Sequence, residues 1–243
     1  MTPRTLVLAA CVVLAAAICV RLGFWQLSRM REKHAIHAAQ RALLAEPPID
    51  VAQALPAPPP PGGRRVRVHG RWDRSAHVLL SGRTHMGAAG VSLVSAMRLA
   101  SGEAVLVERG WLAAADSRSA HPEASPDSVA ELTGVALPLE RSRHPTPWVA
   151  LPSLDARSRL WSARALDADS AAARFAGPLA PWMLRALPES PREPAAVERP
   201  IPEPYEVPDE AMHLSYAIQW FAFAVIIAGG SLALATRRKP AAG

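Results

Sequence analysis

The chain has 243 residues, of which 50% are hydrophobic and 5% aromatic, and it carries a formal net charge of +6. Its two cysteines, Cys11 and Cys19, are too few for a disulfide framework or a four-ligand zinc site. Five basic residues near the two ends supply +5 of the charge, so the 28–213 segment holds 22 basic and 21 acidic residues. Because this segment is nearly neutral overall, we expect no nucleic-acid binding.

The first predicted element is a transmembrane helix over residues 1–27. Thr5–Val20 is an uncharged apolar run, and its continuation to Leu27 makes the helix long enough to cross a hydrocarbon core of about 30 Å. Trp25 then lies in the aromatic belt at one interface. The alternative is a cleaved signal peptide, because Ala15–Ala17 resembles a small-residue cleavage site.

Residues 28–63 are predicted to extend this helix outward and then to form a proline-rich spacer. Ser28–Leu44 contains good helix formers, and Pro47 and Pro48 stop the helix. Ala57–Gly63 is rich in proline and ends in two glycines, which is typical of a stiff spacer followed by a flexible break.

The 64–187 segment is predicted to be a mostly antiparallel β-rich domain. Valines and Trp72 alternate with arginines and a histidine over residues 65–72, which is the period of a half-buried strand. The turn at Ala100–Glu103 favours a hairpin, and Asp167–Ala176 favours one short helix. Further strands are expected at His77–Leu80, Val91–Leu99, Ala104–Glu108, Glu131–Leu137 and Arg159–Ala163.

Two residues at the end of the Ala104 strand are predicted to be structural. Gly110 is expected to permit the turn that closes this strand, because glycine tolerates dihedral angles that other residues avoid. Trp111 is expected to plug the sheet with its large ring.

A proline-rich tether is predicted over residues 188–213, followed by a second transmembrane helix over 214–236. Tyr216–Thr236 is free of charge, and its length of roughly 31 Å as a helix fits one bilayer crossing. Arg237–Lys239 follows at once and marks residues 237–243 as a cytoplasmic tail. The expected fold class is therefore an α+β membrane protein, with two transmembrane helices flanking a mostly antiparallel β-rich extracytoplasmic domain.

The start of the second span carries residues suited to a cofactor. His213, Tyr216, Ala217 and Trp220 share one helix face at spacings of three, four and seven residues. An imidazole beside aromatic and small side chains suits a lipid-soluble macrocycle with an axially ligated iron. The alternative is a histidine in an aromatic belt that only sets the depth of the helix, and the residues alone favour this alternative.

Four motifs, in order and spacing over nearly the whole chain, resemble those of the Surfeit locus (Shy-type) protein family. They are Arg21–Arg29 (RLGFWQLSR), Val66–Trp72 (VRVHGRW), Val105–Trp111 (VLVERGW) and His213–Phe221 (HLSYAIQWF). The chain departs from the family pattern at two places. Met212 stands where the family usually has asparagine, and Arg31–Lys33 replaces the usual Trp-Lys after the first span.

The resemblance implies a function in the respiratory chain. It implies a non-enzymatic chaperone that assists cytochrome c oxidase assembly, acting on haem a delivery into the large subunit of a haem-copper oxidase. It further implies haem a as a transient cofactor, with His213 as the iron ligand and Tyr216, Ala217, Trp220 and Trp25 around the macrocycle. The alternatives are a membrane-anchored scaffold without a cofactor and an enzyme of haem maturation.

The same resemblance implies partners and a location. The partners are the large oxidase subunit and membrane lipid, with haem a synthase as a further candidate. The location is a bacterial inner membrane, which the chain crosses twice, with both termini cytoplasmic and the central domain periplasmic.

Overall fold

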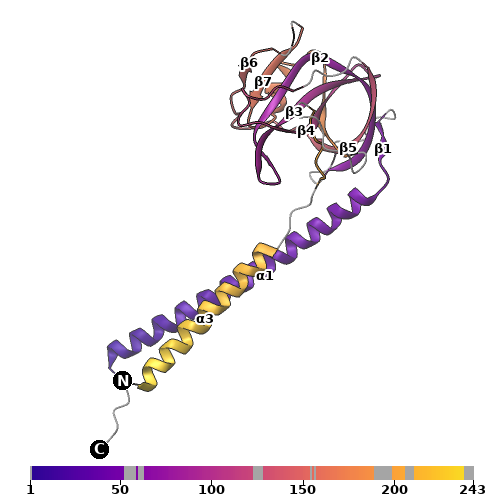
Figure 1. Ribbon diagram of the computed structural model, residues 1–243. Helices are drawn as coiled ribbons and strands as arrows, with labels where there is room; N and C mark the ends of the chain where they lie inside the picture. Colours follow the sequence, from indigo (N-terminus) through magenta and orange to yellow (C-terminus); the bar gives the residue numbers. More distant parts are fainter. Residues whose placement is uncertain are drawn as a thin grey trace, which may run out of the picture. The chain divides into compact units, whose positions relative to one another are not determined.

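The protein is described by a computed structural model that covers residues 2–51, 59, 63–122, 128–153, 155, 157–188, 199–205 and 211–237. The chain divides into two compact units, each of which is described by itself (Figure 1). The membrane unit contains residues 1–41 and 207–243, and the sheet unit contains residues 42–206. Most of the predicted spacer, much of the predicted tether and the tail after Arg237 lie outside the described residues.

Two helices, α1 (Pro3–Ala45) and α3 (Ala211–Arg237), form the membrane unit and are both long and apolar enough to cross a membrane. The prediction that the first span continues outward as a helix is confirmed, since α1 is unbroken over 43 residues and ends just before Pro47. At 1.5 Å per residue it is about 65 Å long, roughly twice the hydrocarbon thickness. The chain is therefore a membrane protein with a helix that continues well beyond its spanning part.

Small residues allow α1 and α3 to pack closely, and Figure 1 shows the two helices side by side. Gly23 of α1 is buried, and a Cβ atom placed on it would lie 2.6 Å from the ring of Phe221. Phe24 meets the same ring edge to face, with centroids 5.4 Å apart. Ala217 is only 1% exposed and lies one helical turn before Phe221. Such contacts between small residues and an aromatic ring are typical of helix association in membranes.

Among its described residues, the sheet unit contains eight strands and one short helix. The strand order β3-β4-β8-β5-β2 closes into a ring because β2 also pairs with β3, while β7 and β6 continue the sheet from β2. Five of the strand pairings are antiparallel and three are parallel, so the sheet is mixed and mostly antiparallel. The elements are β1 (Ile49–Asp50), β2 (Arg64–His85), β3 (Ala88–Leu99), β4 (Ala104–Ala113), β5 (Val129–Pro138), β6 (Val149–Leu151), β7 (Arg159–Ala163), α2 (Ala168–Ala172) and β8 (Leu179–Ala186).

The predicted strands at 65–72 and 77–80 are one strand in the structure, so their separation in the sequence analysis is wrong. β2 runs over 22 residues, and its register against β3 shifts between Asp73 and His77. The Asp73 carboxylate accepts a hydrogen bond from the backbone N–H of Ser75, which stabilises the bend at this bulge. The first part of β2 pairs with β5 and the second with β7, so the bend lets one strand serve both parts of the sheet.

Several other sequence predictions are confirmed. The hairpin turn between β3 and β4 has Gly102 at a φ of +86°, and β5 and β7 cover the strands expected there. The short helix is present as α2 and begins after Asp167, whose carboxylate accepts the backbone N–H of Ser170. Strands β1, β6 and β8 are not in the sequence prediction, and β1 pairs with β2 inside the segment predicted to be a spacer.

The main hydrophobic core lies inside the ring of strands. Val66 and Val68 of β2, Val105 of β4 and Leu184 of β8 belong to one buried cluster, although β2 and β4 are not hydrogen-bonded neighbours. Alternate residues of β4 point to the opposite face, where α2 packs in a second cluster with Trp148. The ring is thus filled by side chains and supported from outside by the small helix.

The expected role of Gly110 as a turn residue is wrong, because β4 continues through it to Ala113. Gly110 has a φ of +139°, and a Cβ atom there would lie 2.3 Å from the backbone of Ile201. The backbones of Trp111 and Ile201 exchange two hydrogen bonds of 2.8 Å. Residues 199–205 of the predicted tether are therefore not a free linker, because they lie against the sheet, and residues 211–213 already belong to α3.

Trp111 is buried, as predicted for a residue that plugs the sheet. Its ring stacks on His85 with a centroid distance of 5.1 Å, and His85 Nδ1 lies 2.8 Å from a carboxylate oxygen of Glu203. Residues 199–205 are thus held to the sheet by the backbone bridge at Ile201 and by the contact between Glu203 and His85.

Candidate functional site

The candidate site is the contact between His213 of α3 and Gln26 of α1, both in the membrane unit. His213 Nδ1 lies 3.0 Å from Gln26 Oε1. Because an amide oxygen can only accept, Nδ1 carries the proton and donates it in this hydrogen bond. In a singly protonated ring, the lone pair is then on Nε2. A hydrogen bond of this kind fixes both the tautomer and the orientation of a histidine that ligates a metal.

The aromatic residues predicted beside His213 lie on accessible parts of α3. Tyr216 is 46% exposed, and Trp220 is half-buried with its ring edge-on to Phe223 at 5.9 Å between centroids. These two rings provide apolar surface at the level of the first turns of the helix.

Ala217 has a different environment from the one expected. It lies four residues after His213 and four before Phe221, and both of these neighbours contact α1. Since Ala217 is also buried, its methyl group contributes to the contact between the helices and is not on a surface open to a ligand. The structure therefore separates Ala217 from the exposed aromatic residues of the predicted site.

Trp25 is 57% exposed and lies on α1 next to Gln26. It borders a hollow of about 1050 Å³ that also includes Arg21 and Phe24. All described residues that line this hollow belong to α1. The structure thus brings His213 together with Gln26, whereas Trp25 lines a hollow of its own on the first helix.

Gln26 is the site residue that the sequence analysis did not assign a role. It is a polar residue in an otherwise apolar part of the first span, and such residues usually find a partner inside a helix bundle. That signal is visible in the sequence, although it does not identify the partner. Met212, which is 67% exposed, has no side-chain group that could hold the imidazole by a strong hydrogen bond, and Gln26 supplies this bond from the other helix.

Comparison with known proteins gives a family match over most of the chain. The model of the SURF1 family matches residues 13–225, which include most of both membrane helices and the whole sheet unit. Proteins called "SURF1-like protein" from Rickettsia conorii, Rickettsia felis and Rickettsia bellii are each 30% identical to the chain over 152 residues, or 62% of its length.

The aligned region spans 60%, 63% and 59% of these relatives, about three fifths of their length. The family match confirms the resemblance found in the four sequence motifs. The chain belongs to the SURF1 family.

Proposed function

We propose that this chain is an assembly factor for haem-copper (cytochrome c) oxidase and that it does not act as an enzyme. The observation that carries the proposal is the SURF1 family match, which extends over both helices and the sheet unit. The proposed partner is the large oxidase subunit, with haem a synthase as a further candidate. The proposed location is a bacterial inner membrane, with residues 28–213 outside the cytoplasm, because basic residues follow α3 directly.

We further propose that the chain assists the delivery of haem a and that His213 is its iron ligand. If bound, haem a would supply an iron that takes a nitrogen ligand, which His213 would provide. The residues fit this group, since Gln26 holds Nδ1 and leaves the Nε2 lone pair available. Tyr216 and Trp220 offer apolar contact to the macrocycle. Trp25 and Ala217 have less direct roles in holding it, because Trp25 lines a hollow on α1 and Ala217 is buried.

A structural explanation of the same contact must also be tested. A hydrogen bond between polar side chains of two spans stabilises helix association without any cofactor. In that case the chain is a membrane-anchored scaffold, and the Gln26–His213 contact only holds α1 against α3. A chain that turns over a haem substrate by itself would instead be an enzyme of haem maturation.

The deciding experiment is the absorption spectrum of the full chain purified in detergent from cells that make haem a. We expect a haem band in the wild type, its loss or shift in His213→Ala, and no change in the control His144→Ala, which alters an exposed histidine of the sheet unit. Gln26→Leu is expected to lower haem occupancy without removing the ligand. Membrane insertion should persist in all variants, because the apolar part of α3 is intact.

The amount of assembled oxidase in cells tests the assembly function, and the spectrum of the purified protein tests the haem ligand. Loss of the assembled oxidase in cells lacking the chain supports the assembly function, whereas normal oxidase levels contradict it. A colourless wild-type protein, or full haem occupancy in His213→Ala, contradicts the haem-ligand proposal and favours the scaffold.

A further inference from the structure

Arg21 is the charged residue inside the first membrane span, and it lies on the face of α1 that points away from α3. Gly23, two residues later, is buried against Phe221 of α3. At 3.6 residues per turn, a separation of two residues places side chains on nearly opposite faces of a helix. Arg21 is accordingly exposed, as are Phe24 and Trp25.

The depth of Arg21 in the membrane follows from the length of the span. A hydrocarbon core of about 30 Å takes about 20 helical residues, which from Thr5 extend to Phe24. Arg21 is then in the last turn of the core, and Trp25 and Ser28 are at the level of the headgroups. An arginine at this depth keeps its charge by extending its long side chain to the interface. Its guanidinium group thus reaches the level of the phospholipid phosphates.

Within the described part of the chain, Arg21 has no hydrogen-bond or ion-pair partner. The acidic residues of the membrane unit are Glu32, Asp209 and Glu210. Glu32 pairs with Arg29 at 2.7 Å and is about three helical turns from Arg21. Asp209 and Glu210 lie outside the described residues.

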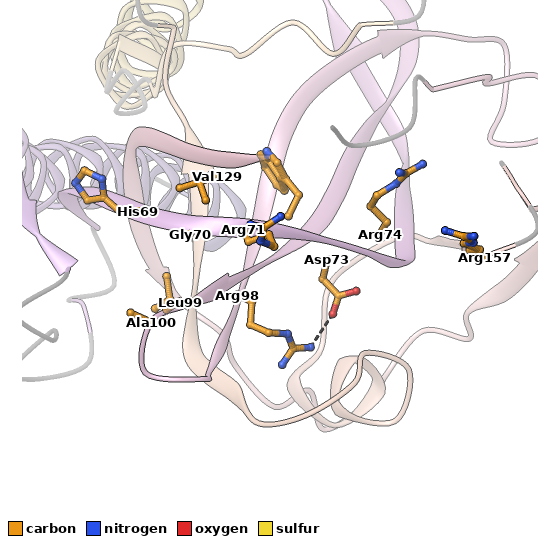
Figure 2. Close-up of a pocket in the computed structure, with 11 residues that line it drawn as sticks. His69, Gly70, Arg71, Asp73, Arg74, Arg98, Leu99, Ala100, Val129 and Arg157 are labelled. Carbon is orange, nitrogen blue, oxygen red and sulfur yellow. Dashed lines mark hydrogen bonds and ion pairs between the residues drawn. The ribbon is translucent and has the colours of Figure 1, made fainter. Parts of the chain in front are cut away.

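Arginines that line a hollow of the sheet unit have a different environment. Where β2 bends, Arg98 donates to the Asp73 carboxylate at 2.7 Å, and Figure 2 marks this ion pair. Arg74 of the same hollow pairs with Asp155 at 3.3 Å. These two arginines are paired with carboxylates of the chain itself, whereas the described residues offer Arg21 no such group.

Arg21 borders the hollow of about 1050 Å³ on the surface of α1. Three groups of its lining can donate hydrogen bonds, and their spacing of four and three residues places them on one side of the helix. They are the Arg21 guanidinium, the Trp25 indole N–H and the Ser28 hydroxyl. Ala17 and Ile18, one turn deeper in the membrane, are apolar.

The chemistry of this face favours a phospholipid. A guanidinium group binds phosphate oxygens through two parallel hydrogen bonds. Close packing of helices in membranes uses small residues such as Gly23, whereas Phe24 and Trp25 beside Arg21 are bulky. We propose that this face of α1 binds a phospholipid of the leaflet at the Leu27 end of the span, with the phosphate on Arg21 and an acyl chain along Ile18. The site is independent of the proposed oxidase function.

The test uses the full chain in dodecyl maltoside, stripped of lipid, and counts the lipid molecules that it binds by native mass spectrometry. The probes are dioleoyl phosphatidylglycerol and dioleoylglycerol, which has the same acyl chains without the phosphate. We expect phosphatidylglycerol to be retained and dioleoylglycerol not. Inorganic phosphate at the same concentration should not displace the lipid, because it has no chains that contact the helix.

Three variants assign the binding to Arg21. Arg21→Gln is expected to bind phosphatidylglycerol about tenfold more weakly, since hydrogen bonds between charged groups are lost. This variant should still insert, because removing a charge from a span favours insertion. Arg21→Lys keeps the charge without the planar fork and should bind at intermediate strength. The matched control is Arg31→Gln, an exposed arginine of α1 outside the hollow, which should leave binding unchanged.

Each outcome decides the proposal. Unchanged binding in Arg21→Gln overturns it and leaves a partner helix with a carboxylate as the explanation of Arg21. An equal loss in Arg31→Gln also overturns it, because the effect is then one of charge alone. Dioleoylglycerol binding as tightly as phosphatidylglycerol contradicts the phosphate contact, and displacement by inorganic phosphate contradicts the acyl chain. If Arg21→Gln is not recovered, wild-type binding in Arg21→Lys contradicts the paired hydrogen bonds.

Discussion

Replacing Gly110 with alanine is expected to release residues 199–205 from the edge of β4. The new Cβ atom would lie 2.3 Å from the carbonyl carbon and oxygen of Ile201 and 2.6 Å from the nitrogen of Pro202. These are backbone atoms, so no side-chain rotation relieves the contact. Either β4 or the segment at Ile201 must move, and the segment is held by fewer bonds than a strand inside the ring.

The magnitude follows from comparison with Gly102→Ala. Both glycines have a positive φ, and such backbone conformations cost an alanine about 1–3 kcal/mol. Nothing lies within 4 Å of a Cβ atom at Gly102, so that variant bears the backbone cost alone. Gly110→Ala also loses the two hydrogen bonds between Trp111 and Ile201, each of which contributes about 0.5–1.5 kcal/mol. The expected difference between the variants is therefore about 2 kcal/mol.

Two measurements on the full chain test this reasoning. Thermal unfolding should show Gly110→Ala melting roughly 4–8 °C below Gly102→Ala, given the size of the sheet unit. Hydrogen–deuterium exchange should show faster exchange at Trp111 and Ile201 in Gly110→Ala only. If the two variants have the same melting temperature and the same exchange at these amides, the segment does not depend on Gly110 and the reasoning is refuted.

Two further predictions concern the helix pair and the sheet core. Gly23→Val is expected to separate α1 from α3, because the new side chain would overlap the Phe221 ring. The control Gly229→Val should leave the helices together, because nothing lies within 4 Å of a Cβ atom at that position. Cross-linking of the two helices measures the difference. Burial is the main cause that lowers the pKa of His77 to about 4, below its ordinary value of 6.5, and the nearby charge of Arg109 is the second cause. As pH falls from 6.5 towards 4, the unfolded chain therefore gains a proton that the folded chain does not, and about 3 kcal/mol of stability should be lost. Urea unfolding at pH 7.5 and pH 5 should show about 2 kcal/mol of this loss, and its persistence in His77→Leu would contradict the assignment.

The parts of the fold that the sequence predicts well are those with a local pattern. The apolar spans, the β3–β4 hairpin and the strand β5 each show their period within a few residues. β8 also alternates, with Ala180, Trp182 and Leu184 buried, but Pro181 between them is a residue that usually argues against a strand. The closing of the ring depends on pairings between distant segments, which no local pattern contains.

The same distinction applies to the sites. His213 is recognisable because it opens an apolar span, whereas its partner Gln26 is 187 residues away and is found only in the folded chain.

The position of β8 has a consequence for the order of events during synthesis. β8 lies between β4 and β5, and it pairs with both, although it is the last strand of the ring to leave the ribosome. Until Ala186 has emerged, β4 and β5 each present an unpaired edge that can join another chain. Only 24 residues separate the end of β8 from the start of α3 at Ala211. Completion of the sheet and membrane insertion of α3 therefore follow each other closely, and a nascent chain halted between Pro138 and Leu179 leaves both edges open to aggregation.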